Sequence, residues 1–305
     1  MFSFILRRVL WAIPVILVVS SITFLLMHSV PGSPFTRERA LPPAIQKNLE
    51  AKYHLNDPLW KQYIDYMYGF VRLDFGPSIA YRSRTVNDIL AQQWPVTATL
   101  GGVAFLFAVC IGIPLGVLSA VKQNTLIDNG SMVAAMLGVS IPAIALGPFL
   151  IWIFALKLKW FPVATWGSPA HIILPALTLS TAYLSRFARI TRASMLQVVR
   201  EEYILAARAK GLRETVVNLR HAFRNALIPV TTIAGPAFAD IVTGSLVVEQ
   251  IFAIPGIGKY YVQSIGNRDY PVIMATTLLF ALIIVVMNLL VDISYAMLDP
   301  RIRYS

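Results

Sequence analysis

Charged residues are scarce in this sequence, and their scarcity excludes most soluble folds. Only 13% of the 305 residues are Asp, Glu, Lys or Arg, whereas 57% are hydrophobic. Soluble domains carry about a quarter charged residues, and a soluble chain of this length could not bury so much apolar surface. Disorder is excluded too, because disordered chains are charge-rich and poor in aliphatic residues. The composition indicates a membrane protein.

Cysteine and histidine are also rare, which excludes several kinds of chemistry. The single cysteine, Cys110, rules out an internal disulfide and a thiolate metal site; we expect it to be a small buried side chain. The four histidines are scattered, and no His-Glu-x-x-His motif is present. Gly258-Lys259 is followed by Tyr260, so no phosphate-binding loop is formed. We therefore expect this chain to bind no cofactor and no metal.

Apolar stretches of membrane-spanning character recur along the chain. A bilayer crossing needs about 20 apolar residues in a helix. The first stretch follows Arg7 and Arg8 like a signal peptide, but it is too long and lacks a small-residue cleavage site. The fourth is short, with Arg186 and Arg189 close behind it, and such side chains can reach the headgroups. We predict an all-α protein with six transmembrane helices, at 9–30, 96–121, 131–156, 172–185, 226–248 and 272–297.

The distribution of lysine and arginine predicts the orientation. Fourteen of them flank the ends of the spans on one side, nine of these between 186 and 224, whereas the short loops opposite hold four. Because cytoplasmic loops are enriched in these residues, both termini are predicted to be cytoplasmic. The net charge is +11, and the lysines and arginines that produce it lie between apolar stretches rather than on a polar surface. We therefore expect membrane lipid, and no nucleic acid, as a partner.

The segment 31–95 is predicted to be external and to form short amphipathic helices. Asn56-Asp57-Pro58 carries helix-start chemistry, and apolar residues follow at helical spacing. Thr85 with Asp88 three residues later is a second start signal. We expect the aromatic residues of this segment to pack on the spans rather than to bind a ligand.

The basic connection between the fourth and fifth spans has the pattern of a short helix. Glu201 and Glu202 fall in its first turn, Lys210 in its last, and Gly211 just beyond it, as the helix dipole and a left-handed terminating residue require. Ala206 and Ala207 are expected to form a small-residue face that another protein can approach. The enrichment of arginine and lysine in cytoplasmic loops accounts for the arginines. It does not explain why a short helix is followed by a glycine and then by a second amphipathic segment at 214–225.

Several residues inside the spans invite a functional interpretation. Asp240 lies near the middle of the fifth span, where a water-lined pathway or another subunit is a better neighbour than lipid. Glu249 precedes a Pro/Gly-rich stretch at 251–258 and is expected to hydrogen-bond within it, with substrate contact as the weaker alternative. Both are translocation-pathway or gate candidates. Gly112 and Gly116 form a Gly-x-x-x-Gly pattern that predicts close helix packing.

The run Ala206-Ala207-Arg208-Ala209-Lys210-Gly211, followed by Leu227-Ile228-Pro229, resembles the EAA loop of ABC importer permeases of the peptide/nickel branch. Leu205 stands where the consensus has Glu, and the gap from Gly211 to Pro229 is longer. The resemblance is closest to the B-type permease subunit of oligopeptide importers. It extends along the chain through weaker motifs at 31–34, 53–58, 74–78, 244–258, 267–271 and 299–304.

This resemblance implies a type I ABC importer permease fold, with a first transmembrane helix at 1–30, an external segment at 31–95 and a five-helix core at 96–300. The core would contain the coupling loop 186–226. A second homologous permease, two ABC ATPases holding ATP and Mg, and an extracytoplasmic peptide-binding protein are the implied partners. The chain itself would be no enzyme. The implied ATPase-coupling residues are Glu201, Glu202, Tyr203, Ala206, Ala207, Lys210 and Gly211.

The implied function is peptide uptake across a bacterial inner membrane, and dipeptides, glutathione or nickel are alternative cargoes of the same branch. Two other classes of protein compete with it. A single-chain secondary carrier would show repeated halves and buried charged pairs, and no repeat is visible. An intramembrane enzyme needs paired catalytic groups, and no histidine lies near Asp240 in the sequence.

Overall fold

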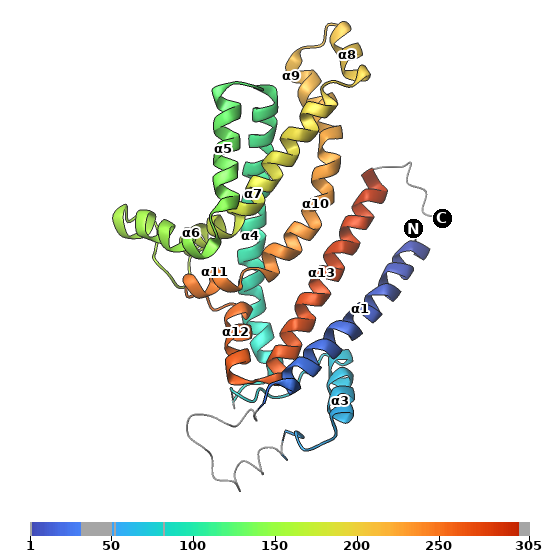
Figure 1. Ribbon diagram of the computed structural model, residues 1–305, viewed down its shortest axis with the longest axis vertical. Coiled ribbons are helices and arrows are strands. Elements are labelled where there is room, and N and C mark those ends of the chain that lie inside the picture. The colour runs from blue at the N-terminus through green and yellow to red at the C-terminus, as the bar shows by residue number, and fades with distance from the viewer. Residues whose placement is uncertain (1, 32–50, 52, 82, 299–305) are drawn as a thin grey trace. The chain divides into compact units, whose positions relative to one another are not determined.

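The structure, a computed structural model, describes residues 2–31, 51, 53–81 and 83–298. Within these residues the regular secondary structure is helical, and one isolated bridge joins Pro77 and Thr85. The chain forms two compact units (Figure 1). The first comprises residues 1–97 and 255–285, and the second comprises 98–254 and 286–305. Helices α4 (Val86–Val121) and α13 (Tyr270–Leu298) each contribute residues to both units.

In the first unit, the segment between α1 and α4 packs on the first span. Helix α3 (Leu59–Val71) lies against α1 (Phe2–Ser29), and the Tyr63 hydroxyl is 2.8 Å from the Ser20 hydroxyl and 3.0 Å from that of Ser21. The Tyr63 ring meets the edge of Phe24 at 5.4 Å between centroids. The predicted amphipathic helix is confirmed, and Tyr63 and Tyr66 pack as predicted, whereas Trp60 and Tyr68 are 67% and 57% exposed.

A buried carboxylate joins the external segment to the last helix of the first unit. Asp269, between α12 (Ile257–Asn267) and α13, accepts hydrogen bonds from the Ser78 hydroxyl and from the backbone N–H groups of Ile79 and Ala80, the latter two at 3.1 and 3.0 Å. The Asp269 side chain is fully buried. One residue therefore fixes the position of 78–80 at the start of α13.

The helix start at Thr85 is confirmed, but it begins α4 rather than a separate external helix. The Thr85 hydroxyl accepts from the Asp88 N–H at 3.1 Å, and the Asp88 carboxylate accepts from the Thr85 N–H at 3.0 Å. This reciprocal cap nucleates one helix of 36 residues. Pro95 lies inside this helix, which therefore begins before the apolar stretch predicted at 96–121, as proline permits within a membrane bundle.

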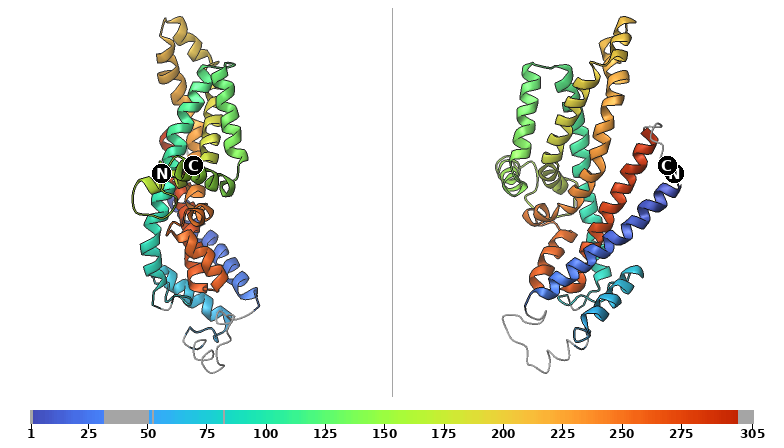
Figure 2. Two further views of the ribbon diagram at one scale, coloured as in Figure 1. Left: turned by 90° about the vertical axis from the view of Figure 1, so that its left-hand side faces the viewer. Right: turned by 45° about the vertical axis from the view of Figure 1, so that its right-hand side comes forward.

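The second unit contains the rest of α4 and the helices of the basic connection. Its elements are α5 (Leu126–Ser140), α6 (Ala143–Leu150), η1 (Ile151–Lys157), α7 (Ala170–Val198), α8 (Glu202–Ala209), α9 (Glu214–Val216), η2 (Val217–Ala222), α10 (Phe223–Thr243) and α11 (Leu246–Ile251). Helices α4, α7 and α10 run side by side (Figure 2) around a core of Ala108, Phe187, Val230 and Ala237.

Close packing of α4 on α7 depends on two glycines. A Cβ atom at Gly112 would lie 2.6 Å from the carbonyl oxygen of Leu184, and one at Gly116 would meet the backbone at Ala188. The predicted Gly-x-x-x-Gly contact is therefore confirmed. Cys110, in contrast, is exposed, so its predicted burial is wrong. It lies two residues from Ala108 and Gly112, which turns it away from the face of α4 that contacts α7.

The number of spans differs from the prediction. Among the described residues, four helical segments are long and apolar enough to cross a membrane: 6–29, 86–121, 214–251 and 270–291. A fifth is added if α5 and the α6–η1 segment count as one span, although they are bent by 108°. The stretch predicted as one span at 131–156 is bent rather than continuous, because Pro142 interrupts the helix. Helix α7 is long enough to cross, but its arginines lower its hydropathy.

Some predictions concern residues outside the described part of the chain. Residues 32–50, 52 and 82 of the segment 31–95 are not described, and neither is most of the predicted motif at 31–34. The predicted motif at 299–304, with Arg301 and Arg303, also lies outside the described residues. Six crossings, the cytoplasmic termini and the three-part division at residues 30 and 95 stay predictions.

Candidate functional site: the loop between α7 and α10

The short helix expected in the basic loop is present as α8. Glu201 is its N-cap with extended backbone angles, and the chain leaves it through Lys210 and Gly211. Gly211 has a φ of +78°, and no atom lies within 4 Å of the position that a Cβ would take. The predicted left-handed glycine is thus confirmed, and it turns the chain into α9.

The buried face of α8 corrects one prediction. Ile204 and Ala207, three residues apart on one side of the helix, are buried against Met195 of α7 and against residues of η2 and α10. Ala207 therefore does not belong to an exposed small-residue face, and only Ala206 of the pair is exposed. The sequence could not distinguish the two because the rotation of so short a helix depends on what it packs against.

The outward face of α8 combines charge and apolar surface. Its exposed side chains are those of Glu201, Glu202, Tyr203, Leu205, Ala206 and Lys210. The Tyr203 hydroxyl accepts a hydrogen bond from the Asn225 amide at 2.6 Å, which fixes the aromatic ring. Leu205 is 54% exposed, so an apolar side chain occupies the position where the consensus carries Glu. Such a face can bind a protein groove that has both apolar and polar contacts.

An arginine holds the end of α8 in place. The Arg208 guanidinium donates to both carboxylate oxygens of Glu214, at 2.8 and 3.3 Å, and to the Val199 carbonyl oxygen at 3.4 Å. Bidentate pairing adds directional rigidity. The pair therefore connects α8, α9 and the end of α7 into one piece.

A second polar cluster, which sequence reasoning missed, lies where α4, α5 and α7 meet. Asp128, in the first turn of α5, is 1% exposed and accepts from Arg192 of α7 at 2.6 and 2.7 Å. The Ser119 hydroxyl and the Asn124 N–H, the latter at 2.9 Å, also donate to it. The partners are 64 residues apart, and no local pattern in the sequence indicates the pair.

The two pathway candidates lie away from the coupling loop. Asp240 is exposed in the last turn of α10, and Glu249 is fully buried on α11. Helices α8 and α11 lie at opposite ends of α10 (Figure 1). Glu249 accepts from the Ser245 hydroxyl at 2.8 Å, and its carbonyl accepts from the Ile254 N–H at 2.8 Å. The predicted hydrogen bonding of Glu249 within this stretch is confirmed, whereas a role in the pathway stays a prediction for both residues.

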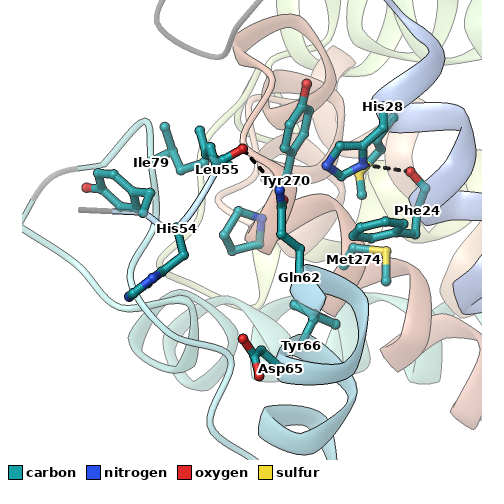
Figure 3. A pocket seen from close by; sticks show the side chains of 13 residues that line it. Phe24, His28, His54, Leu55, Gln62, Asp65, Tyr66, Ile79, Tyr270 and Met274 are labelled. Carbon is teal, nitrogen blue, oxygen red and sulfur yellow. Dashed lines mark hydrogen bonds between the residues drawn. The ribbon is translucent and has the colours of Figure 1, made fainter. Parts of the chain in front are cut away.

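The first unit contains a pocket of about 210 Å³ that the sequence did not indicate (Figure 3). It is lined by the end of α1, residues 53–55, α3 and the start of α13. The His28 Nδ1 atom is 2.8 Å from the Phe24 carbonyl oxygen, so it carries the proton and leaves Nε2 as an acceptor. Neither His28 Nε2 nor the Tyr66 hydroxyl, both of which are buried, has a hydrogen-bond partner among the described residues. Burial raises the pKa of the Tyr66 phenol.

The fold of this chain is that of type I ABC importer permeases. A structure of the MetNI methionine ABC transporter aligns with a TM-score of 0.57 and 21% identity, covering 69% of this chain and 96% of that chain. A crystal structure of an amino acid ABC transporter aligns with a TM-score of 0.52 and 17% identity, covering 70% of this chain and 94% of that one. At these identities the two alignments establish the fold alone.

The family follows from the sequence comparison. Residues 112–304 match the binding-protein-dependent transport system inner membrane component, and residues 1–101 match its N-terminal region. The chain belongs to this family. It is 50% identical to the dipeptide transport permease DppB of Bacillus subtilis over 96% of both chains. It is 48% identical to the oligopeptide transport permease OppB of Salmonella typhimurium over the full length of both.

Proposed function

We propose that this chain is one permease subunit of an ATP-driven importer that carries peptides across a bacterial inner membrane. The observation that carries the proposal is the identity of about half of all residues, over nearly the whole chain, to permeases of dipeptide and oligopeptide transport systems. Oligopeptides are the proposed cargo, with dipeptides as the second candidate because one relative at 50% identity is named for them.

The proposed assembly contains a second homologous permease, two ATPase subunits and an extracytoplasmic peptide-binding protein. ATP and Mg would be bound on the ATPases, so this chain would form half of the pathway without hydrolysing ATP. The family description, a membrane component of a binding-protein-dependent system, supports this division of labour.

Coupling is proposed to begin on the outward face of α8. ATPase closure would push on Tyr203, Leu205 and Ala206, which project from the helix. Because Ile204 and Ala207 are packed against α7, η2 and α10, α8 would transmit the displacement to them rather than pivot. The Arg208–Glu214 pair supports the same transmission by stiffening the exit from α8.

Reconstitution tests the proposal directly. The chain would be co-expressed with the proposed second permease and ATPase subunits. The purified complex would be placed in liposomes, with the binding protein outside. Uptake of a labelled oligopeptide should require ATP inside and should persist when ionophores collapse all ion gradients. Uptake by this chain alone, driven by an ion gradient, would contradict the proposal and favour a secondary carrier. Mass spectrometry of the ligand on the purified binding protein would distinguish peptides from glutathione or nickel.

A further inference from the structure

A groove of about 390 Å³ in the first unit lies between the end of α1, helix α12 and the start of α13. These three elements lie together at one end of the unit (Figure 1). Most of the lining is apolar, with Leu26 and Ile265 more than half exposed at its rim. Among the described residues that line it, Arg268 is the only charged one.

We expect the groove to lie at the depth of the lipid headgroups, because two candidate spans end beside it. Thr23, Leu26 and Met27 of α1 line it near the end of the apolar span 6–29. Residues 270 and 273 also line it, and they begin the apolar span 270–291. Two spans therefore pass from hydrocarbon to water beside the same groove. Tyr261 and Tyr270 line it as well, and tyrosine is enriched at this interface.

Arg268 has one buried donor without a partner. Its Nη1 atom is buried and makes no hydrogen bond to any residue that the structure describes. The adjacent carboxylate, Asp269, accepts instead from Ser78, Ile79 and Ala80 on the other side of the chain. The backbone of Arg268 is fixed in the left-handed region at a φ of 53°, as the C-cap of α12. A buried guanidinium N–H that lacks an acceptor is unfavourable. An anionic oxygen from a bound ligand would supply that acceptor and stabilise the site.

We propose that the groove binds a membrane phospholipid, with the lipid phosphate on Arg268 and an acyl chain along the apolar surface between α1 and α12. Guanidinium groups bind phosphate oxygens through charge-assisted hydrogen bonds. Since the lining offers one cation and no carboxylate, an anionic lipid such as phosphatidylglycerol fits better than a lipid that carries its own cation. The lipid would also fill the gap between α1 and α12.

Photo-crosslinking in the assembled transporter tests this site. The complex would be purified in detergent, depleted of lipid and given phosphatidylglycerol that carries a photoreactive acyl chain, and crosslinked peptides would be mapped. We expect crosslinks in 23–30 and 261–273. Excess unlabelled phosphatidylglycerol should remove them, whereas glycerol phosphate, which lacks acyl chains, and diacylglycerol, which lacks phosphate, should not.

Matched variants locate the contact. Arg268→Gln should lower crosslinking in these peptides about tenfold, because a charge-assisted hydrogen bond is lost, and Arg268→Lys should retain most of it. Ile265→Trp, which fills the groove from an exposed position, should also lower it. Arg72→Gln removes an exposed external arginine outside the groove and should change nothing.

Three results would overturn the proposal. They are unchanged crosslinking in Arg268→Gln, competition by glycerol phosphate as strong as that by phosphatidylglycerol, and absence of crosslinks at 23–30 and 261–273 in the unmodified complex. If the Arg268→Gln variant fails to assemble, the competition experiment on the unmodified complex still tests whether the groove binds a phospholipid.

Discussion

Two groups of buried polar atoms in this protein differ in how completely they are hydrogen-bonded. In the second unit, the Asp128 carboxylate accepts from Arg192, Ser119 and the backbone at Asn124. In the first unit, His28 Nε2, the Tyr66 hydroxyl and Arg268 Nη1 are buried and make no hydrogen bond to any described residue, and the same holds for Thr277 Oγ1 there and for Thr191 Oγ1 of the second unit. Buried polar groups are nearly always paired. The first group therefore fixes helices within the chain, whereas the second consists of sites that something outside the chain can complete.

The largest expected effect is the loss of Arg192. Arg192→Leu leaves the buried Asp128 carboxylate without its cation, and an unpaired buried charge is strongly destabilising. We expect the thermal unfolding midpoint of the detergent-solubilised complex to fall by roughly 5 °C or more. The double variant Asp128→Leu/Arg192→Leu should recover part of the loss, because no charge is then left buried. Equal midpoints for Arg192→Leu and the unmodified protein would show that the pair does not hold α5 to α7.

Gly211 tests whether the loop of the second unit must keep its turn. Gly211→Val introduces a β-branched residue at a φ of +78°, which is strained even though space is available. We expect assembly to persist, while peptide uptake and peptide-stimulated ATP hydrolysis fall together about tenfold. Gly211→Asn is the matched control, because asparagine tolerates the left-handed region. Similar activities for the valine and asparagine variants would argue against a role for the turn in coupling.

Ala206 and Ala207 form a matched pair on α8, of which the first is exposed and the second is buried. Ala206→Trp adds bulk to the exposed face, so the complex should lose stimulated ATP hydrolysis while this chain remains folded. Ala207→Trp adds the same bulk against Met195 and Ile204, and overpacking of this kind costs about 1–3 kcal/mol. We expect lower expression and a lower unfolding midpoint for Ala207→Trp only. Crosslinking from position 206 should capture an ATPase subunit, and capture of lipid alone would contradict the assignment of this face.

The smallest expected effect concerns Tyr66 in the first unit. Tyr66→Phe removes a buried hydroxyl that has no partner, so it should raise the stability of the purified chain by about 1 kcal/mol. Tyr63→Phe in the same helix removes a hydroxyl that contacts Ser20 and Ser21, and should lower it. A lower unfolding midpoint for Tyr66→Phe would mean that a ligand or a water molecule hydrogen-bonds to the Tyr66 hydroxyl in the purified protein.

Local rules were enough for the parts of the fold that depend on neighbouring residues. The membrane class, the first span, the helix start at Thr85 and the left-handed Gly211 follow from composition, capping and glycine geometry. Residues brought together by tertiary packing were not predictable in this way. Asp128 and Arg192 are 64 residues apart, and the pocket around Tyr66 combines segments of the chain from 24 to 274.

Proline shows where these local rules stop. Pro95, Pro229 and Pro236 lie inside helices, whereas Pro142 begins a new helix at a bend of 108°. The same residue type gives both outcomes, because neighbouring helices can replace the lost hydrogen bond in one place and not in another. The face of α8 that contains Ala207 was mispredicted for a related reason, since its burial depends on α7 and η2.

The carboxylate of Asp269 also sets an order of events during synthesis. Its backbone donors at Ile79 and Ala80 leave the ribosome 190 and 189 residues before it does. At typical rates of 5–20 residues per second, that interval is roughly 10–40 s. During this time the segment 78–80 waits without its acceptor while the chain of the second unit is inserted. The hydrogen bonds that complete the first unit can therefore form only when synthesis is nearly complete. A chain that stops before Asp269 leaves these two N–H donors without their acceptor.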